Sequence, residues 1–298
     1  LNNSKLESQS WISKETIKLI LSDAIYLEKV IVYDNRQPEF FEKTNVYISK
    51  RSSSRSFKNA KIILKENFNL LEKIEKEFNV EKEILLALWS IETNFGRNLG
   101  KMDLVSSLAT LSYDKRRSEF FTKQLLTLLK LVDKNIINKE MLYGSWAGAM
   151  GNFQFMPSTI MNYGIDYDND GKIDLKKSKY DAIASAANYI NKIGWKYKDY
   201  CFKEVSFSNK INKSLFNHSA RNIKNKKSIG YWNEKGLIIK KNSKVESKLI
   251  AALVLPDGDI NSPKYLVFPN YEKILKWNRS LRFALTVCTL ADMIKNDI

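Results

Sequence analysis

The stretch Glu83-Ile84-Leu85-Leu86-Ala87-Leu88-Trp89-Ser90-Ile91-Glu92-Thr93-Asn94-Phe95-Gly96 decides how the rest of the chain is interpreted. Its apolar residues recur with the period of a helix, and we expect this helix to end at Gly96. The predicted apolar face consists of Ile84, Leu85, Leu88, Trp89, Ile91 and Phe95, with Leu86 near its margin. The predicted polar side consists of Ser90, Thr93 and Asn94. Glu92 falls inside the apolar arc, between Leu85 and Leu88, and not on the polar side.

A carboxylate on an apolar helix face must be paired, lie in a cleft or be protonated. Burial raises the pKa of a carboxyl group, and a raised pKa is what a general acid needs near neutral pH. Structural ion pairs place carboxylates in similar settings. The spacing therefore leaves two interpretations of Glu92 open: a general acid, or a structural glutamate bonded to a buried partner.

Composition describes a globular chain with a strong positive charge. The 298 residues suffice for one large domain or two modest ones, and 44% of them are hydrophobic. Only 11 Gly and 5 Pro argue against long disordered or fibrous segments. The net charge of +16 favours polyanions such as nucleic acid, envelope polymers or lipid headgroups, or it reflects a Lys- and Asn-rich genome. The lysines are dispersed and no nucleic-acid motif is present, so we expect no nucleic-acid partner.

The residue types available narrow the chemistry. His218 is the single histidine, which makes histidine triads and His-rich metal sites improbable, so catalysis must come from carboxylates, hydroxyls and amides. The spacing of Cys201 and Cys288 does not decide whether they form a disulfide. No run of about twenty apolar residues could span a membrane. The first ten residues are polar and carry no signal-peptide core.

Periodicity predicts a mainly helical chain with a β-rich part after Trp195. Helices are expected over Trp11–Val32, Phe57–Phe78, Leu104–Leu111, Ser118–Val132, Ser178–Ile193 and Tyr271–Ile294. Strands are expected at Phe202–Phe207, Leu237–Ile239 and Leu249–Leu255. Loops are expected at Asp34–Pro38, Ser49–Ser56 and over most of Ser206–Ser228. Asp103 is a predicted N-cap, and Pro157 suits the first turn of a helix.

An acidic stretch has the spacing of a calcium loop. Acids stand at its positions one, three, five and nine, as Asp166, Asp168, Asp170 and Asp174, with Gly171 at position six. This spacing lets hard oxygen ligands converge while the glycine permits a sharp turn. The alternative is a solvated acidic turn, but four acids in register would repel one another without a cation.

The remaining ligands of this loop depart from the standard pattern. Lys172 at position seven would supply only its backbone carbonyl, and position twelve is Lys177, not a bidentate Glu. Asp181, at the start of the next helix, is the predicted replacement. We expect a structural Ca²⁺, with Na⁺ or Mg²⁺ as alternatives.

Several motifs in order resemble the B-type membrane-bound lytic murein transglycosylases. The matching stretches, from about residue 10 to the end, are Asp34-Asn35-Arg36-Gln37-Pro38-Glu39-Phe40, Ile91–Gly96, Leu108–Tyr113, Gly144-Ser145-Trp146-Ala147-Gly148-Ala149-Met150-Gly151, Gln154-Phe155-Met156-Pro157-Ser158, the Asp166–Asp181 loop, Ala187-Asn188-Tyr189, Pro269-Asn270-Tyr271 and Trp277-Asn278-Arg279-Ser280. One such motif would be a weak signal, but this many in family order is a strong one.

The resemblance implies a mainly α fold of the α+β kind. Its parts would be a lysozyme-like helical core with an EF-hand-like loop, a flanking α subdomain and a small β-rich subdomain. The predicted boundaries are an N-terminal α subdomain over 10–79, a catalytic core over 80–195 with the cation loop at 166–181, a β-rich subdomain over 196–268, and C-terminal helices over 269–298. The stretch Ser206–Ser228 matches the family poorly.

The resemblance also implies an activity. Members cleave the β-1,4 bond between N-acetylmuramic acid and N-acetylglucosamine in peptidoglycan and leave a 1,6-anhydromuramyl end. Glu92 matches their single catalytic acid, which protonates the leaving oxygen and then accepts the proton of the attacking O6 hydroxyl. The residues fit this chemistry, because ordinary glycosidases need a second carboxylate and the stretches around Gln154 supply none.

Family matching assigns six further residues. Ser145 would hydrogen-bond the catalytic carboxyl. The sugar-binding residues would be Gln154, Tyr189 and Asn278, and Arg116 and Arg117 would bind stem-peptide or lactyl carboxylates. Each has a plainer interpretation: Ser145 as a small packing residue, Tyr189 as a half-buried core aromatic, and the arginines as a solvated helix start.

The implied partner is the glycan strand of peptidoglycan, bound by a monomeric protein in the periplasm or associated peripherally with the outer membrane. Export rests on the resemblance alone, and no lipobox cysteine supports a lipid anchor. Two alternatives stay open: a hydrolytic muramidase that releases reducing ends, and a non-catalytic peptidoglycan-binding envelope protein.

Overall fold

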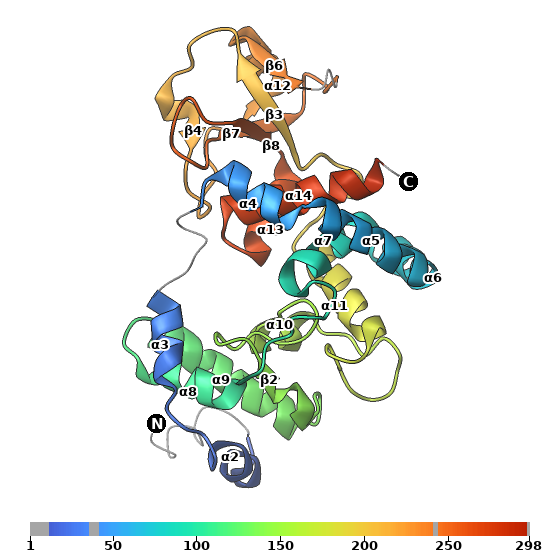
Figure 1. Cartoon of the computed structure of the whole chain (residues 1–298), viewed down its shortest axis with the longest axis vertical. Helices are drawn as coiled ribbons and strands as arrows, with labels where there is room; N and C mark the ends of the chain where they lie inside the picture. The colour runs from blue at the N-terminus through green and yellow to red at the C-terminus, as the bar shows by residue number, and fades with distance from the viewer. Residues whose placement is uncertain (1–11, 36–41, 241–243, 297–298) are drawn as a thin grey trace. The chain divides into compact units, whose positions relative to one another are not determined.

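The computed structural model describes residues 12–35, 42–240 and 244–296 (Figure 1). The chain divides into two compact units. Unit 1 comprises Leu1–Pro38, Asn67–Phe78 and Leu88–Tyr189, and unit 2 comprises Glu39–Glu66, Asn79–Ala87 and Ile190–Ile298. Residues 36–40 of the motif that begins at Asp34 lie outside the described residues, as do the first ten. No helix in the described ranges is long and apolar enough to cross a membrane.

Unit 1 is helical apart from a two-stranded ribbon. Its helices are α2 (Lys14–Leu21), α3 (Glu28–Asn35), α6 (Phe68–Phe78), α8 (Leu104–Tyr113), α9 (Ser118–Asp133), the 3₁₀ helix η2 (Lys139–Leu142) and α10 (Pro157–Tyr163). The helices α7 (Lys82–Thr93) and α11 (Lys179–Lys192) contribute residues to both units. The ribbon pairs β1 (Met102–Asp103) with β2 (Tyr143–Gly144) in antiparallel fashion.

The core of unit 1 forms around α8, which is buried along almost its whole length. The Asp103 side chain caps this helix by accepting from the Ser106 N–H at 2.5 Å, as predicted. Helices α3 and α9 pack on α8, and α10 packs on α9. Pro157 opens α10 at its first position, which confirms the prediction for that residue.

Unit 2 combines helices with the larger sheet. Its elements are α4 (Thr44–Arg51), α5 (Ser54–Glu66), β3 (Phe202–Phe207), η3 (Lys213–Leu215), β4 (Phe216–Asn217), β5 (Lys227–Ser228), α12 (Ile229–Glu234), β6 (Leu237–Ile239), β7 (Ile250–Val254), β8 (Lys264–Val267), α13 (Pro269–Trp277) and α14 (Leu281–Lys295). The sheet order is β4-β7-β8-β3-β6, with β5 also paired to β7. Among the strand pairs of the described residues, only β4–β7 is parallel.

Trp232 belongs to the hydrophobic core of this sheet and is fully buried, together with Leu253 and Leu266. Its indole N–H donates to the Ala251 carbonyl at 3.1 Å, so the buried polar atom is satisfied. A disulfide joins Cys201, just before β3, to Cys288 in α14. The cysteine question that spacing left open is thus answered by the fold of unit 2.

The predicted strands at Phe202–Phe207 and Leu237–Ile239 are confirmed, and the third is β7. Three predicted helices are each divided, the third of them at Ser280. The helix predicted over Trp11–Val32 ends at Leu21, because the backbone N–H groups of Ile25 and Leu27 donate to the hydroxyls of Ser106 and Thr110 on α8. That predicted over Phe57–Phe78 breaks at Asn67, between α5 and α6.

The loop predicted at Ser49–Ser56 is wrong. The serines there end and begin helices: the Ser52 hydroxyl donates to the Ile48 carbonyl at the end of α4, and the Ser53 hydroxyl accepts from the Ser56 N–H at the start of α5. The helix predicted over Tyr271–Ile294 is interrupted in the same way, since the Ser280 hydroxyl accepts from Phe283 N–H and starts α14.

Candidate active site and cation loop

Glu92 lies in the last turn of α7 and is half-buried. The helix does not simply fray after it. Asn94, Phe95 and Gly96 follow with φ angles of 50°, 59° and 80°, so three consecutive residues are left-handed. Glycine adopts this region freely and asparagine does so readily, but a bulky residue does not, so the surrounding contacts must hold Phe95 in place.

The polar side predicted for α7 is wrong for Ser90 and Thr93, which are both buried. The Thr93 hydroxyl donates to the Asn152 carbonyl at 2.7 Å and accepts from the Gly96 N–H at 3.0 Å. A hydroxyl with two partners can be buried without an unsatisfied atom. Thr93 therefore fixes the turn that immediately follows Glu92.

Asn152 is the second residue that fixes this turn, and the sequence did not single it out. Its Oδ1 accepts from the Trp89 indole N–H at 2.9 Å, and its Nδ2 donates to the carbonyls of Leu175 and Lys176 at 2.8 and 3.0 Å. A β-carbon on Gly96 would lie 2.5 Å from that same Oδ1. Sequence spacing could not predict this role, because the bonding partners of Asn152 lie 63, 23 and 24 positions away in the chain.

The small-residue stretch forms a tight turn against this network. The Ser145 hydroxyl accepts from the Ala149 N–H at 3.0 Å, and Met150 forms a β-bridge with Phe155. Gln154 lies within the bridged turn with φ 50°, and its Nε2 donates to the Gly151 carbonyl at 3.0 Å. Ser145, the predicted contact of the catalytic carboxyl, and Gln154, a predicted sugar contact, are thus each bonded to backbone groups within unit 1.

Tyr189 is half-buried on α11. Its ring stacks on Tyr163 with centroids 4.5 Å apart and meets Phe155 edge-on at 5.9 Å. Burial raises the pKa of the Tyr189 phenol, so the group stays a neutral donor and acceptor at physiological pH. Asn278, the remaining predicted sugar contact, is half-buried and caps the C-terminus of α13 in unit 2.

Arg116 and Arg117 share one buried carboxylate. Arg116 Nε donates to Asp34 Oδ2 at 2.7 Å, and Arg117 donates to Asp34 Oδ1. The Asp34 side chain is 1% exposed, whereas the arginines are 48% and 40% exposed. From the sequence, Asp34 was assigned only to a helix-breaking motif. Its two arginine partners lie 82 and 83 positions further along the chain, and no local pattern predicts such a contact.

The acidic loop brings Asp166, Asp168 and Asp181 together. One carboxylate oxygen from each lies within 4.8 Å of the others. Asp181 is fully buried and accepts from the backbone N–H groups of Tyr167 and Asp174 at 2.8 and 2.9 Å. Burial is the main cause that raises the pKa of the Asp181 carboxyl, and a bound cation would favour its charged form.

The other predicted ligands of the loop have backbone partners. Asp170 accepts from the Lys172 N–H and Asp174 from the Lys176 N–H, both at 2.9 Å. The Tyr167 hydroxyl donates to Glu77 on α6 at 2.6 Å, and burial raises the pKa of this phenol to about 12. The loop is therefore braced against α6 independently of any cation.

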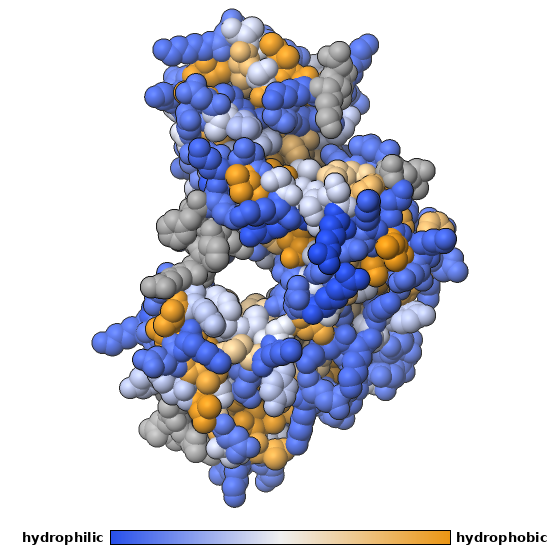
Figure 2. Space-filling model, in the orientation of Figure 1, coloured by the Kyte–Doolittle hydropathy of each residue, from blue (hydrophilic) through white to orange (hydrophobic). Residues whose placement is uncertain are grey.

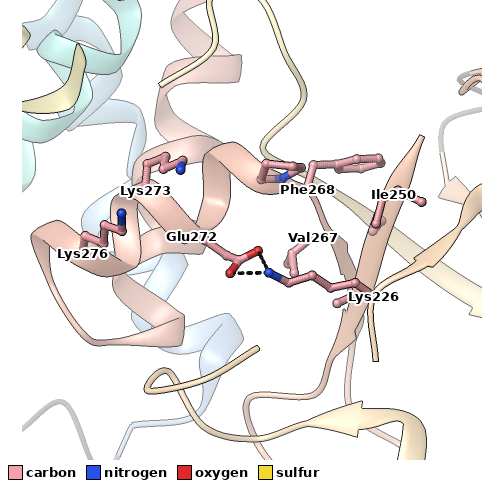
Figure 3. Close-up of a pocket in the computed structure, with 10 residues that line it drawn as sticks. Lys226, Ile250, Val267, Phe268, Glu272, Lys273 and Lys276 are labelled. Carbon is pink, nitrogen blue, oxygen red and sulfur yellow. Dashed lines mark hydrogen bonds and ion pairs between the residues drawn. The ribbon is translucent and has the colours of Figure 1, made fainter. Parts of the chain in front are cut away.

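A separate cavity of about 310 Å³ lies within unit 2 and contains none of the predicted site residues. Figure 3 shows Lys226 bound to Glu272, with Lys273 and Lys276 on the same helix, α13. Burial lowers the pKa of Lys273, and the charge of Lys276 lowers it further. The cavity is a cationic recess, distinct in chemistry from the Asn152 amide and the Thr93 hydroxyl that hold the turn after Glu92.

The family model described as "Transglycosylase SLT domain" matches residues 3–292 of this chain. The chain belongs to this family. It is 28% identical over 300 residues to membrane-bound lytic murein transglycosylase B of Escherichia coli (strain K12), covering 97% of this chain and 80% of that protein. The family consists of enzymes that cleave peptidoglycan, which confirms the predicted family and enzyme class.

Two solved structures show the same fold. SltB3 from Pseudomonas aeruginosa, in complex with NAG-anhNAM-pentapeptide, has a TM-score of 0.89 and 31% identity over 98% of this chain and 77% of that one. Escherichia coli Slt35, in complex with calcium, has a TM-score of 0.84 and 26% identity over 99% of this chain and 91% of that one. The predicted mainly α, lysozyme-like fold class is confirmed.

Proposed function

We propose that Glu92 is the only acid–base residue of this lytic transglycosylase, and that it cleaves the bond between N-acetylmuramic acid and N-acetylglucosamine. The observation that carries the proposal is the setting of Glu92 at the end of α7. The turn after it is held by Thr93 and Asn152, and the adjoining stretch Gly144–Ser158 contains no Asp or Glu. A two-carboxylate mechanism would need a second acid there.

The chemistry then proceeds with one proton carrier. The Glu92 carboxyl protonates the glycosidic oxygen as the C1–O bond breaks, and the N-acetylglucosamine alcohol leaves. The resulting carboxylate accepts the proton of the muramyl O6 hydroxyl while O6 bonds to C1. The product is a 1,6-anhydro ring, the Glu92 proton is restored, and no water is consumed. Intramolecular attack by O6 carries a large entropic advantage over attack by water.

The remaining predicted residues are assigned to substrate binding. Ser145 would orient the Glu92 carboxyl, and Gln154, Tyr189 and Asn278 would contact sugars with their amides and phenol. Arg116 and Arg117 would bind substrate carboxylates, since guanidinium groups match carboxylates geometrically. Their exposed surfaces, next to a single compensating Asp34, support this role.

The test is a digest of purified sacculi followed by mass spectrometry of the muropeptides. We expect anhydromuramyl ends from the wild-type protein and none from Glu92→Gln. Reducing muramic ends would make the protein a hydrolytic muramidase. Retained sacculus binding with no product would make it a non-catalytic binding protein.

We also propose that the acidic loop holds a structural Ca²⁺ through Asp166, Asp168 and Asp181, with further oxygen atoms from Asp170, Asp174 and the Lys172 carbonyl. The convergence of three carboxylates at one point, one of them fully buried, supports the cation. Titration calorimetry should detect one Ca²⁺ per chain in the wild-type protein and none in Asp168→Ala. Equal heats from both proteins would contradict the site.

For location and assembly we propose a monomer acting in the periplasm on peptidoglycan glycan strands, with peripheral attachment to the envelope. The support is the activity of the family, whose substrate is the wall polymer. Light scattering of the purified protein and fractionation of cells carrying the full-length gene test the two statements. A stable dimer or a cytoplasmic pool would contradict them.

A further inference from the structure

Unit 1 exposes aromatic rings on α3 and at the end of α8. Tyr26, Tyr33 and Tyr113 are 60%, 47% and 83% exposed. Together with Trp146 these residues form what we call the α3 aromatic surface. Single exposed rings are common on proteins, but a group of exposed rings that contact one another is typical of a binding surface. The Glu92 mechanism uses none of the four.

The rings of the α3 aromatic surface are held in two pairs. Tyr26 and Tyr113 meet edge-to-face with centroids 6.3 Å apart, and Tyr33 meets Trp146 at 6.4 Å and a tilt of 54°. Each pair joins α3 or the loop before it to a different part of unit 1. The rings are therefore oriented before any ligand arrives, which reduces the entropy lost on binding.

The segment that carries Tyr26 and Tyr33 is itself fixed on α8 (Figure 1). The N–H groups of Ile25 and Leu27 donate to α8 hydroxyls at 3.1 and 2.9 Å, and Val30 is fully buried. The same contacts that ended the predicted helix at Leu21 thus present the two tyrosines. The two tyrosines are therefore carried by a segment that is hydrogen-bonded to α8 and packed on it.

A positive centre adjoins both ring pairs along the chain. Asp34 follows Tyr33 directly, and Arg116 and Arg117 follow Tyr113 by three and four residues. Asp34 binds both arginines, so two positive charges and one negative charge leave a net charge of +1. The buried carboxylate also prevents the two guanidinium groups from repelling each other.

We propose that the α3 aromatic surface binds glycan strands at sugars beyond those that react, and that Asp34 positions the arginines beside it. The inference rests on the proposed function for the identity of the polymer. A pyranose ring presents a C–H face that is apolar and an edge of hydroxyls, which matches a tyrosine ring and its phenol. Acidic substituents on the strand match the net positive arginine pair. Trp146, next to Ser145 in sequence, connects this surface to the residues assigned to the reaction.

A second occupant must be tested, because aliphatic side chains are exposed on the same segment. Ile25 and Val32 are 64% and 47% exposed, and Figure 2 shows orange and pale side chains between blue ones in the region of α3. Such a patch also suits another protein chain. The preponderance of tyrosines beside arginines favours the glycan, and self-association is an outcome of the test.

The first experiment measures binding without catalysis. In the Glu92→Gln protein, Tyr26→Ala, Tyr33→Ala and Tyr113→Ala are combined, and co-sedimentation with purified sacculi gives the affinity. We expect at least a tenfold loss, whereas Tyr197→Ala, at an exposed tyrosine of unit 2, should change it less than twofold. Equal affinities of the triple variant and the control would overturn the proposal. Tyr113→Ala alone removes the most exposed of these rings and should weaken binding about threefold. This single variant tests the proposal even if the triple variant does not fold.

The second experiment uses the active enzyme. The ratio of kcat/KM for long strands to kcat/KM for a tetrasaccharide should fall at least fivefold in the triple variant. An equal loss on both substrates, or a wild-type dimer that dissociates in the triple variant, would overturn the proposal. Failure of the wild-type protein to form anhydro ends would instead contradict the proposed transglycosylase function, because the binding experiment does not depend on products. Asp34→Asn should lower the same ratio with little change in kcat, and an unchanged ratio would remove Asp34 from its positioning role.

Discussion

Unit 1 places carboxylates in two contrasting settings. The Asp166–Asp181 loop gathers three carboxylates within 4.8 Å and surrounds them with backbone N–H donors. The end of α7 presents Glu92 beside a turn held by an amide, Asn152, and a hydroxyl, Thr93. Acids that lie together favour a cation, whereas a half-buried carboxyl at a helix end, such as that of Glu92, suits a proton donor and acceptor.

The two settings are physically joined through Asn152. Its side chain binds the Leu175 and Lys176 carbonyls, and the Lys176 N–H donates to Asp174 of the acidic loop. The loop therefore supports the segment that shapes the turn after Glu92. The loop acids proposed to hold the cation are thus separate from Glu92, the proposed reacting acid, but they are linked through Lys176 and Asn152 to the turn that follows Glu92.

Glu92→Gln is expected to have the largest effect. The amide cannot deliver or accept the proton, so kcat should fall by about a thousandfold, within the range known for general acid–base catalysis. The free energy of unfolding should change little, because glutamine keeps the shape of the side chain. Rate assays on sacculi check this, with Glu119→Gln on the exposed side of α9 as the matched control. A loss of less than tenfold would show that a second acid shares the work.

Asn152→Leu should break the connection between the two settings. Leucine keeps the branched shape and the number of heavy atoms but leaves the Trp89 indole N–H and the Leu175 and Lys176 carbonyls without their partner. We expect about 3 kcal/mol of destabilisation in urea unfolding. Asn261→Leu, at an exposed position of unit 2, should cost less than about 0.5 kcal/mol. Equal costs would mean that the Asn152 network contributes nothing specific.

Calcium should act on the acidic loop and only through it. A ligand at about one hundred times its Kd stabilises the folded state by about 2.7 kcal/mol, so calcium should raise the Tm. Asp168→Ala combined with Asp170→Ala should cancel the gain, and a chelator should reproduce the loss in the wild-type protein. Melting curves that do not respond to chelator would count against a bound cation.

Two glycines provide the smallest and most closely matched test. Gly96 and Gly171 both have left-handed φ angles, of 80° and 88°. A β-carbon at Gly171 meets nothing within 4 Å, so Gly171→Ala should cost only about 1 kcal/mol of backbone strain. Gly96→Ala adds a clash with Asn152 and should cost about 2 kcal/mol or more in the same unfolding assay. Equal costs would show that the turn after Glu92 is not tightly held.

The sequence predicted those features that depend on local patterns. The Asp103 cap, Pro157 at the start of α10 and the strand Phe202–Phe207 follow from cap chemistry and periodicity, and the structure confirms them. The convergence of Asp166, Asp168 and Asp181 follows from loop spacing in the same way.

Predictions from the sequence were wrong or incomplete where a residue bonds a partner that is distant in the chain, because such a contact overrides the local pattern. The sequence pattern predicts Thr93 to be a surface residue. In the structure its hydroxyl donates a hydrogen bond to the carbonyl of Asn152, 59 positions away, and the side chain is buried. The three serines after Arg51 look like a loop, yet two of them bond the ends of neighbouring helices. Asp34 was part of a motif without a role, because its partners are two arginines in the connection between α8 and α9. Periodicity cannot report such contacts.

The most direct test of the account is where the oxygen at the new muramyl end comes from. Sacculi would be digested in water labelled with heavy oxygen, and the released muropeptides analysed by mass spectrometry. If Glu92 acts alone and O6 attacks C1, the muramyl ends are anhydro and carry no label. Labelled reducing ends would show that water attacks C1 and would contradict the single-acid transglycosylase mechanism.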